Sequence, residues 1–182
     1  MGEIRSQRPA LLIVGALSMS VSALEWIHDR VVSQWGPIAC ESEIFDFNQT
    51  SYYDQEMGLN LKKQFWAAEK LIDRADLAEI KQRTNGWEVE YADEYKSGDV
   101  VRPINCDPGY LTEAKLVLAT TKNRDHRIYL SDGIFAEVTL YYQGHGWQDS
   151  RWTYPDYRTA PYHAFFDRCR EFLRERYQEE DV

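Results

Sequence analysis

An uninterrupted apolar run near the start of the chain is the clearest feature of its hydrophobic pattern. Residues 10–17 contain no polar side chain, which is typical of a central strand covered on both faces. Residues 22–35 then carry apolar side chains at helical spacing, from the Ser-x-x-Glu capping box of Ser22 to the stop at Gly36. The pattern predicts a buried strand followed by a helix.

The next stretch predicts two strands and a second helix. Residues 39–47 favour a strand. Residues 61–72 alternate as a strand does, but they also place apolar side chains on one helical face. We favour the strand, because Asp73 and Asp76 are suited to cap a separate helix that runs to about Tyr91.

Residues 100–122 contain several residues that favour turns or helix caps. Residues 100–106 predict a strand, which Pro103 would place at an edge or a bulge. Thr112 is suited to cap a short helix that continues through Lys122. A strand over residues 115–121 remains open.

A hairpin is predicted for residues 126–130 and 134–142. A two-residue loop would mix polar and apolar side chains on each face, whereas a three-residue loop, Ser131-Asp132-Gly133, separates them. The predicted cross-strand pairs are Leu130 with Ile134, Ile128 with Ala136, and Arg127 with Glu137.

The order of the predicted elements indicates an α+β fold. It reads β-α-β-β-α-β, then a helix, the hairpin, and a final helix whose first turn suits Pro161. We expect a ferredoxin-like core with a mostly antiparallel sheet, extended by the β-hairpin and the C-terminal helix. Residues 1–182 should form a single domain, with residues 1–8 flexible and 178–182 frayed.

Composition narrows the expected partners. A net charge of −9 argues against nucleic acid. The three cysteines, Cys40, Cys106 and Cys169, have no metal or disulfide spacing, which fits a reducing cytoplasm. The longest apolar run is too short to span a bilayer, and the N-terminal stretch lacks a signal-peptide layout. We expect a cytoplasmic protein with a small-molecule ligand; its oligomeric state stays open.

Three side chains are candidates for acid/base catalysis: Glu137, His126 and Asp107. The four histidines show no metal-binding spacing, so no metal site is predicted, and no cofactor is indicated. The pair of Arg127 and Glu137 has a purely structural interpretation as a cross-strand ion pair. Residues 107–110 could end a strand before a helix N-terminus that receives an anion, or form an ordinary turn.

Further residues are candidates for ligand binding. Cations would orient an anionic substrate, and aromatic side chains would contact a ring. The loop at residues 152–158 could cover a pocket or anchor the last helix. The ligand-binding candidates are Tyr110, Lys115, Lys122, Arg127, Tyr129, Tyr154, Asp156 and Arg158.

Several stretches together resemble the prokaryotic family called domain of unknown function 4416. They are SEIFDF (42–47), YY (52–53), EMG (56–58), IK (80–81), TN (84–85), DPGYLT (107–112), KLVLATTK (115–122), HRIYL (126–130), AEVTL (136–140) and WTYPDYR (152–158). The resemblance implies no established activity, although members often carry a GTP-binding label. This chain has no G-x-x-x-x-G-K-[ST] loop, and Asp125 lies one place too late for a guanine-reading [NT]KxD motif.

These observations leave three functions open. The first is a small-ligand-binding domain, with a pocket that could be enzymatic, for an anionic or ring-bearing metabolite. The second is a non-catalytic interaction or sensing module. The third is binding of a nucleotide or RNA without Walker motifs, for which Tyr129, Phe135 and Tyr141 could stack bases.

Overall fold

The structure is a computed structural model that describes residues 2–3, 6–50, 53–95 and 100–180. Tyr52, in one of the stretches that carry the family resemblance, lies outside this part. The helices are α1 (Val21–Trp35), α2 (Asp54–Met57), α3 (Leu77–Glu94) and α4 (Ala160–Glu180), with 3-10 turns η1 (Arg74–Asp76) and η2 (Pro155–Arg158). The strands are β1 (Leu11–Ser18), β2 (Ile38–Glu41), β3 (Phe45–Phe47), β4 (Leu61–Ala68), β5 (Ile104–Leu111), β6 (Lys115–Thr120), β7 (Ile128–Ser131), β8 (Ile134–Gln143) and β9 (Gly146–Asp149).

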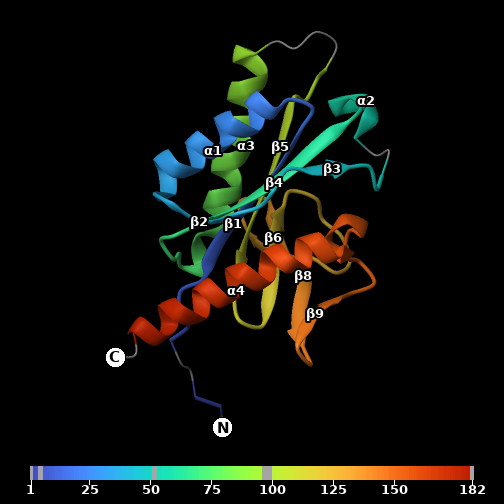
Figure 1. The fold of residues 1–182 in the computed structure, drawn as a ribbon. Coiled ribbons are helices and arrows are strands. Elements are labelled where there is room, and N and C mark those ends of the chain that lie inside the picture. Colours follow the sequence, from blue (N-terminus) through green and yellow to red (C-terminus); the bar gives the residue numbers. More distant parts are fainter. Residues whose placement is uncertain (1, 4–5, 51–52, 96–99, 181–182) are drawn as a thin grey trace.

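One antiparallel sheet organises the described part of the chain. Its strand order is β2-β4-β1-β5-β6-β8-β7, with β3 paired to β4 and β9 paired to β8. Helices α1 and α3 lie on one face, and α4 crosses the other (Figure 1). The predicted α+β class with a mostly antiparallel sheet is therefore confirmed.

Strand β1 is buried along its whole length, as its apolar run predicts. Leu11 and Ile13 belong to the core that contains Phe165 of α4, whereas Leu12 and Val14 belong to the core beneath α1. Successive side chains of a strand point to opposite faces of the sheet. A strand whose two faces are both covered by helices therefore needs apolar side chains at every position. Helix α1 begins at Val21, so Ser22 lies inside its first turn and the predicted cap at Ser22 is wrong.

The strand interpretation of residues 61–72 is confirmed by β4, and α3 follows it as expected. Asp73 caps η1 by accepting a hydrogen bond from the backbone N–H of Ala75 at 2.9 Å. The strand predicted over residues 39–47 is divided into β2 and β3, both of which pair with β4.

The helix predicted from Thr112 to Lys122 is wrong, because this stretch contains strand β6. Thr112 Oγ1 accepts hydrogen bonds from the backbone N–H groups of Ala114 and Lys115, at 3.3 and 3.2 Å. It therefore closes the turn between β5 and β6. Strand β6 lies between β5 and β8, and this position favours a strand although Thr112 by itself favours a helix.

Residues 107–110 lie inside β5 and form neither a turn nor a helix start, so both interpretations of this segment are corrected. Strand β6 pairs with β5 only over Gly109–Leu111. The pairing stops next to Pro108, which has no N–H to donate. A Cβ on Gly109 would lie 2.3 Å from the carbonyl oxygen of Val117, so glycine permits the close approach just before the strands separate.

The expectation for Pro103 is also wrong. Pro103 precedes β5, and β5 is an interior strand between β1 and β6.

The hairpin of β7 and β8 has a different turn from the predicted one. Asp132 and Gly133 have φ angles of 50° and 78° and form a two-residue turn, so Ser131 pairs with Ile134. A register shift at Leu130 then restores the predicted pair of Ile128 with Ala136. Since β7 is an edge strand, Ile128 remains 71% exposed, so the predicted apolar face is not uniformly buried.

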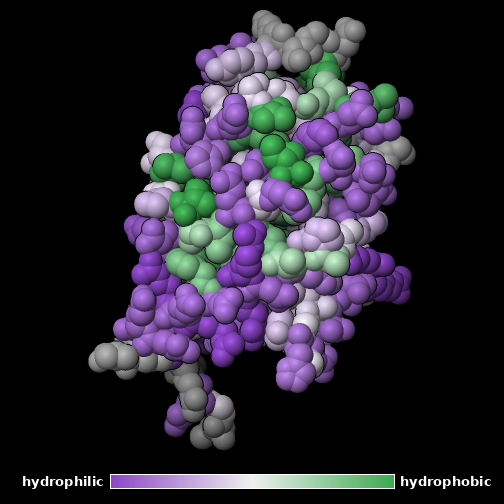
Figure 2. All heavy atoms as spheres, in the orientation of Figure 1, coloured by the Kyte–Doolittle hydropathy of each residue, from purple (hydrophilic) through white to green (hydrophobic). Residues whose placement is uncertain are grey.

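The surface on the α4 side is mainly hydrophilic, with hydrophobic side chains in small separate groups (Figure 2). Among the helices of the described residues, none is both long and apolar enough to cross a membrane.

Candidate functional site

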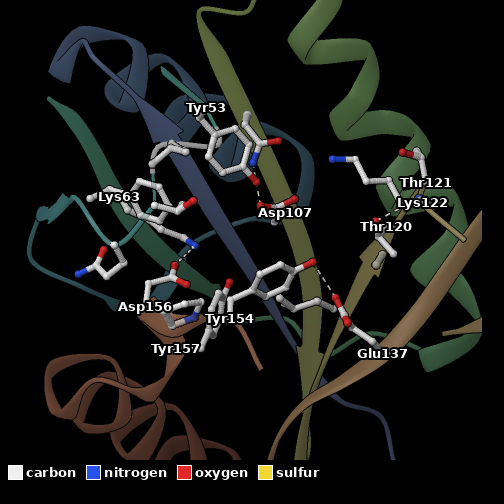
Figure 3. A pocket seen from close by; sticks show the side chains of 18 of the residues that line it. Tyr53, Lys63, Asp107, Thr120, Thr121, Lys122, Glu137, Tyr154, Asp156 and Tyr157 are labelled. Carbon is white, nitrogen blue, oxygen red and sulfur yellow. Dashed lines mark hydrogen bonds and ion pairs between the residues drawn. The ribbon is translucent and has the colours of Figure 1, made fainter. Parts of the chain in front are cut away.

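A pocket of about 140 Å³ lies where β5 and β6 separate. Side chains reach it from β4, β5, α3, β8 and the end of β6, and from the segments around Tyr53 and Tyr154 (Figure 3). Segments that are far apart in the sequence thus meet at one concave site. The space for their side chains exists because β6 stops pairing with β5 at Gly109.

One side of the pocket contains a buried ion pair. Lys63 Nζ donates to Asp156 Oδ2 at 2.7 Å, and the two side chains are 6% and 5% exposed. The Lys63 ammonium also lies 4.5 Å from the centre of the Tyr157 ring, a favourable cation–π distance. Breaking such a pair leaves a charge without compensation, so it fixes η2 against β4.

Asp107 lies in the middle of the pocket (Figure 3). Its Oδ2 accepts a hydrogen bond from Asn105 Nδ2 at 2.7 Å, and its Oδ1 lies 3.6 Å from Lys81 Nζ. Burial by itself would raise the pKa of Asp107, but Lys81, with smaller contributions from Lys63 and Asn105, lowers it below its usual value. Asp107 is therefore ionised at neutral pH, and its side chain is 31% exposed.

Glu137 has partners at both of its oxygens. Oε1 accepts hydrogen bonds from Tyr154 Oη at 3.0 Å and from Arg127 at 3.2 Å. Oε2 lies 2.7 Å from Nε2 of His126, whose ring stacks on Trp152 at 5.1 Å. The contact predicted between Arg127 and Glu137 is present. Glu137 is 6% exposed, and both of its carboxylate oxygens have partners. Its side chain is therefore held in place as part of the pocket wall.

Tyr154 and Tyr157 remain neutral phenols. Burial raises the pKa of Tyr154, and the nearby Glu137 carboxylate raises it further. Burial likewise raises the pKa of Tyr157 well above its usual value. Both can therefore donate a hydrogen bond over the whole physiological pH range.

The predicted site residues divide into three groups. Those that line the pocket are Asp107, Lys122, Glu137, Tyr154 and Asp156. His126 and Arg127 contact Glu137 but are not lining residues. The remaining candidates, Tyr110, Lys115, Tyr129 and Arg158, are not lining residues.

The loop at residues 152–158 contributes both to the pocket lining and to the core. Its Tyr154 and Asp156 line the pocket, whereas Tyr157 also packs in the core against α4.

Three cationic pocket residues were not identified from the sequence: Lys63, Lys81 and Arg102. Lys63 is buried in the middle of β4, and Lys81 is buried on the sheet-facing side of α3. Each of these two lysines occupies a position where the hydrophobic pattern of its strand or helix calls for a buried residue. This could have identified them, because lysine is almost never buried without a partner. Arg102 offered no such signal.

Metal binding has no support from the side-chain arrangement. Within the described ranges, no group of three or more His, Cys, Asp or Glu side chains is placed to hold an ion. The described carboxylates of the pocket are each compensated by a cation.

Comparison with protein families matches the chain to the domain of unknown function DUF4416 over residues 8–172. The chain belongs to this family. The match contains every residue that lines the pocket. No curated protein and no solved structure matched the chain.

Proposed function

We propose that this DUF4416 protein binds a small anionic or ring-bearing metabolite in the pocket around Asp107. One observation carries the proposal: charged and aromatic side chains from distant segments converge on a single concave site. Ligand sites combine apolar and aromatic walls with a few oriented polar groups. Phe47, Tyr53 and Tyr154 supply the walls. Asp107 supplies a polar group at the centre and Lys122 one at the edge (Figure 3).

The topology is compatible with the proposed ferredoxin-like core. Strands β1, β2, β4 and β5, with α1 and α3, follow the chain order β-α-β-β-α-β, and their order in the sheet is β2-β4-β1-β5. Under this description, β6 to β9 extend the core beyond β5, and the pocket forms at the junction. The extension supplies Glu137 and Lys122 to the site.

Catalysis is the second candidate function, and Asp107 is the residue that favours it. An ionised carboxylate that is partly exposed in a pocket can accept a proton from a bound substrate. Glu137 is less suited, because Arg127, His126 and Tyr154 engage it.

A thermal-shift screen of anionic and ring-bearing metabolites tests the proposal. A ligand present at about 100 times its Kd stabilises the folded state by roughly 2.7 kcal/mol and raises Tm by several degrees. We expect anionic hits to shift Lys122→Ala less than the wild type, and to shift the exposed-site control Lys70→Ala fully. A library without any hit would overturn the proposal.

Catalysis is tested on the compounds that bind. Mass spectrometry should show conversion of a hit by the wild type and none by Asp107→Asn. Binding without conversion would leave a binding or sensing protein.

A further inference from the structure

The charges around the pocket nearly cancel. Four cationic and three anionic side chains line it among the described residues. Lys63 pairs with Asp156, and Lys81 lies beside Asp107. Arg102 pairs with Glu88 at 2.8 Å. Because these cations already have carboxylate partners, the pocket offers little excess positive charge to a polyanion. A neutral or singly negative ligand matches it better.

Asp107 can accept a further hydrogen bond from a ligand. An ionised carboxylate can only accept hydrogen bonds. Its Oδ1 lies 3.6 Å from Lys81 Nζ, beyond ordinary hydrogen-bond distance, which leaves that oxygen available. A ligand ammonium would come close to Lys81, whose charge disfavours it. An uncharged donor, such as a hydroxyl group, therefore matches this oxygen.

Tyr157 adds a second, independent indication of a ligand. It lines the pocket and is 2% exposed, and its hydroxyl has no hydrogen-bond partner among the described residues. Buried polar groups nearly always have a partner, because leaving one unpaired is costly. Ligand hydroxyl groups that reach Tyr157 and Asp107 would give each of them a partner.

The size and walls of the pocket fit a single ring. A cavity of roughly 150 Å³ accepts one benzene molecule. This pocket, of about 140 Å³, therefore has room for one six-membered ring, whose substituents would extend to the lining polar groups and to solvent. Two aromatic pairs contribute to its walls: Phe47 with Tyr53, whose centres are 5.9 Å apart, and Tyr154 with Tyr157, at 6.1 Å. Aromatic walls pack against the C–H groups of a ring while polar groups bind its hydroxyls.

The geometry points to a monosaccharide, neutral or carrying one negative charge, as the ligand of this pocket. This inference rests on the proposed function and specifies its ligand. It assigns Asp107 and Tyr157 as the groups that bind ring hydroxyls, with the Tyr53 and Tyr154 side chains as walls.

Matched probes test the inference on the full chain. The sugar probes are glucose, galactose, mannose and the three corresponding hexuronates. Cyclohexanecarboxylate is the first control, because it has the ring size and charge of a hexuronate but no hydroxyl groups. Tripolyphosphate is the second control, as a polyanion. We expect a saturable rise in Tm with at least one sugar and none with the other two probes.

The outcomes separate this inference from the proposed function. An equal or larger shift with cyclohexanecarboxylate or tripolyphosphate would overturn the monosaccharide and leave small-ligand binding standing. No shift with any sugar would also overturn the monosaccharide, whereas only a wider library without hits overturns ligand binding itself.

Tyr157→Phe provides the sharpest variant, because it removes only the unpartnered hydroxyl. We expect Tm of the free protein to stay unchanged or to rise, while calorimetry shows about tenfold weaker binding of the active sugar. The control Tyr129→Phe, at an exposed position outside the pocket, should bind as the wild type does. Unchanged affinity in Tyr157→Phe would contradict the assignment.

Discussion

Lys81 and Asp107 meet although they come from opposite sides of the sheet. Lys81 belongs to α3, whereas Asp107 shares its side of β5 with Leu111, which packs in the core beneath α4. Lys81 Nζ donates to the carbonyl oxygen of Cys106 at 2.6 Å and lies 3.6 Å from Asp107 Oδ1. The contact is made in the part of β5 that β6 does not pair with. The same separation of strands forms the pocket.

Replacing Lys81 with methionine should destabilise the fold. The substitution keeps much of the apolar stem but removes the cation beside Asp107 and leaves the Cys106 carbonyl without this donor. We expect the free energy of unfolding to fall by about 3 kcal/mol, measured by urea denaturation. Lys70→Met, at an exposed position, is the control and should change it by less than about 0.5 kcal/mol. A loss below about 1 kcal/mol for Lys81→Met would contradict the role given to this contact.

Asp107 should make stability depend on pH in the acid range. Its pKa is lowered in the folded state, so its stabilising contribution is present above the unfolded-state pKa of about 3.9. The contribution is lost as pH falls through the folded-state pKa. We expect the difference in unfolding free energy between wild type and Asp107→Asn to shrink steadily below about pH 4. A difference that is constant from pH 7 to pH 2 would show that the Asp107 pKa is not lowered.

The Tyr154 hydroxyl should stabilise the wall of the pocket. It donates to Glu137 and accepts a hydrogen bond from Arg127 at 2.7 Å. Tyr154→Phe removes both contacts while preserving the ring, and we expect a loss of about 1–2 kcal/mol in chemical denaturation. Tyr129→Phe, on the exposed edge strand, should be nearly neutral. Equal effects of the two substitutions would contradict this interpretation.

Gly109, the glycine of β5, should not tolerate a side chain. Alanine would place its Cβ 2.3 Å from the Val117 carbonyl oxygen, so β5 and β6 would have to move apart. We expect Gly109→Ala to lower the free energy of unfolding by about 3 kcal/mol. Gly86→Ala, in α3 with open space around it, should instead stabilise by about 0.5–1 kcal/mol. If Gly109→Ala proves neutral, the close approach of the two strands is not required.

Much of the candidate site could be foreseen because polar residues in a strand or loop are recognisable locally. Asp107, Glu137 and Tyr154 were selected in this way, and all three line the pocket. Tyr110 and Lys115 were selected by the same reasoning and lie elsewhere. Which candidates converge depends on strand order, and strand order is a non-local property.

The sequence by itself determined the elements whose pattern is periodic and long. The buried strand β1, the helix α3 and the α+β class follow from hydrophobic spacing, which reports the environment of each residue directly. Only the tertiary structure decided that Lys115–Thr120 is a strand, because its neighbours β5 and β8 override the local helix signal of Thr112. Only the tertiary structure placed Lys63 and Lys81 in the pocket, since their carboxylate partners lie 93 and 26 residues away along the chain.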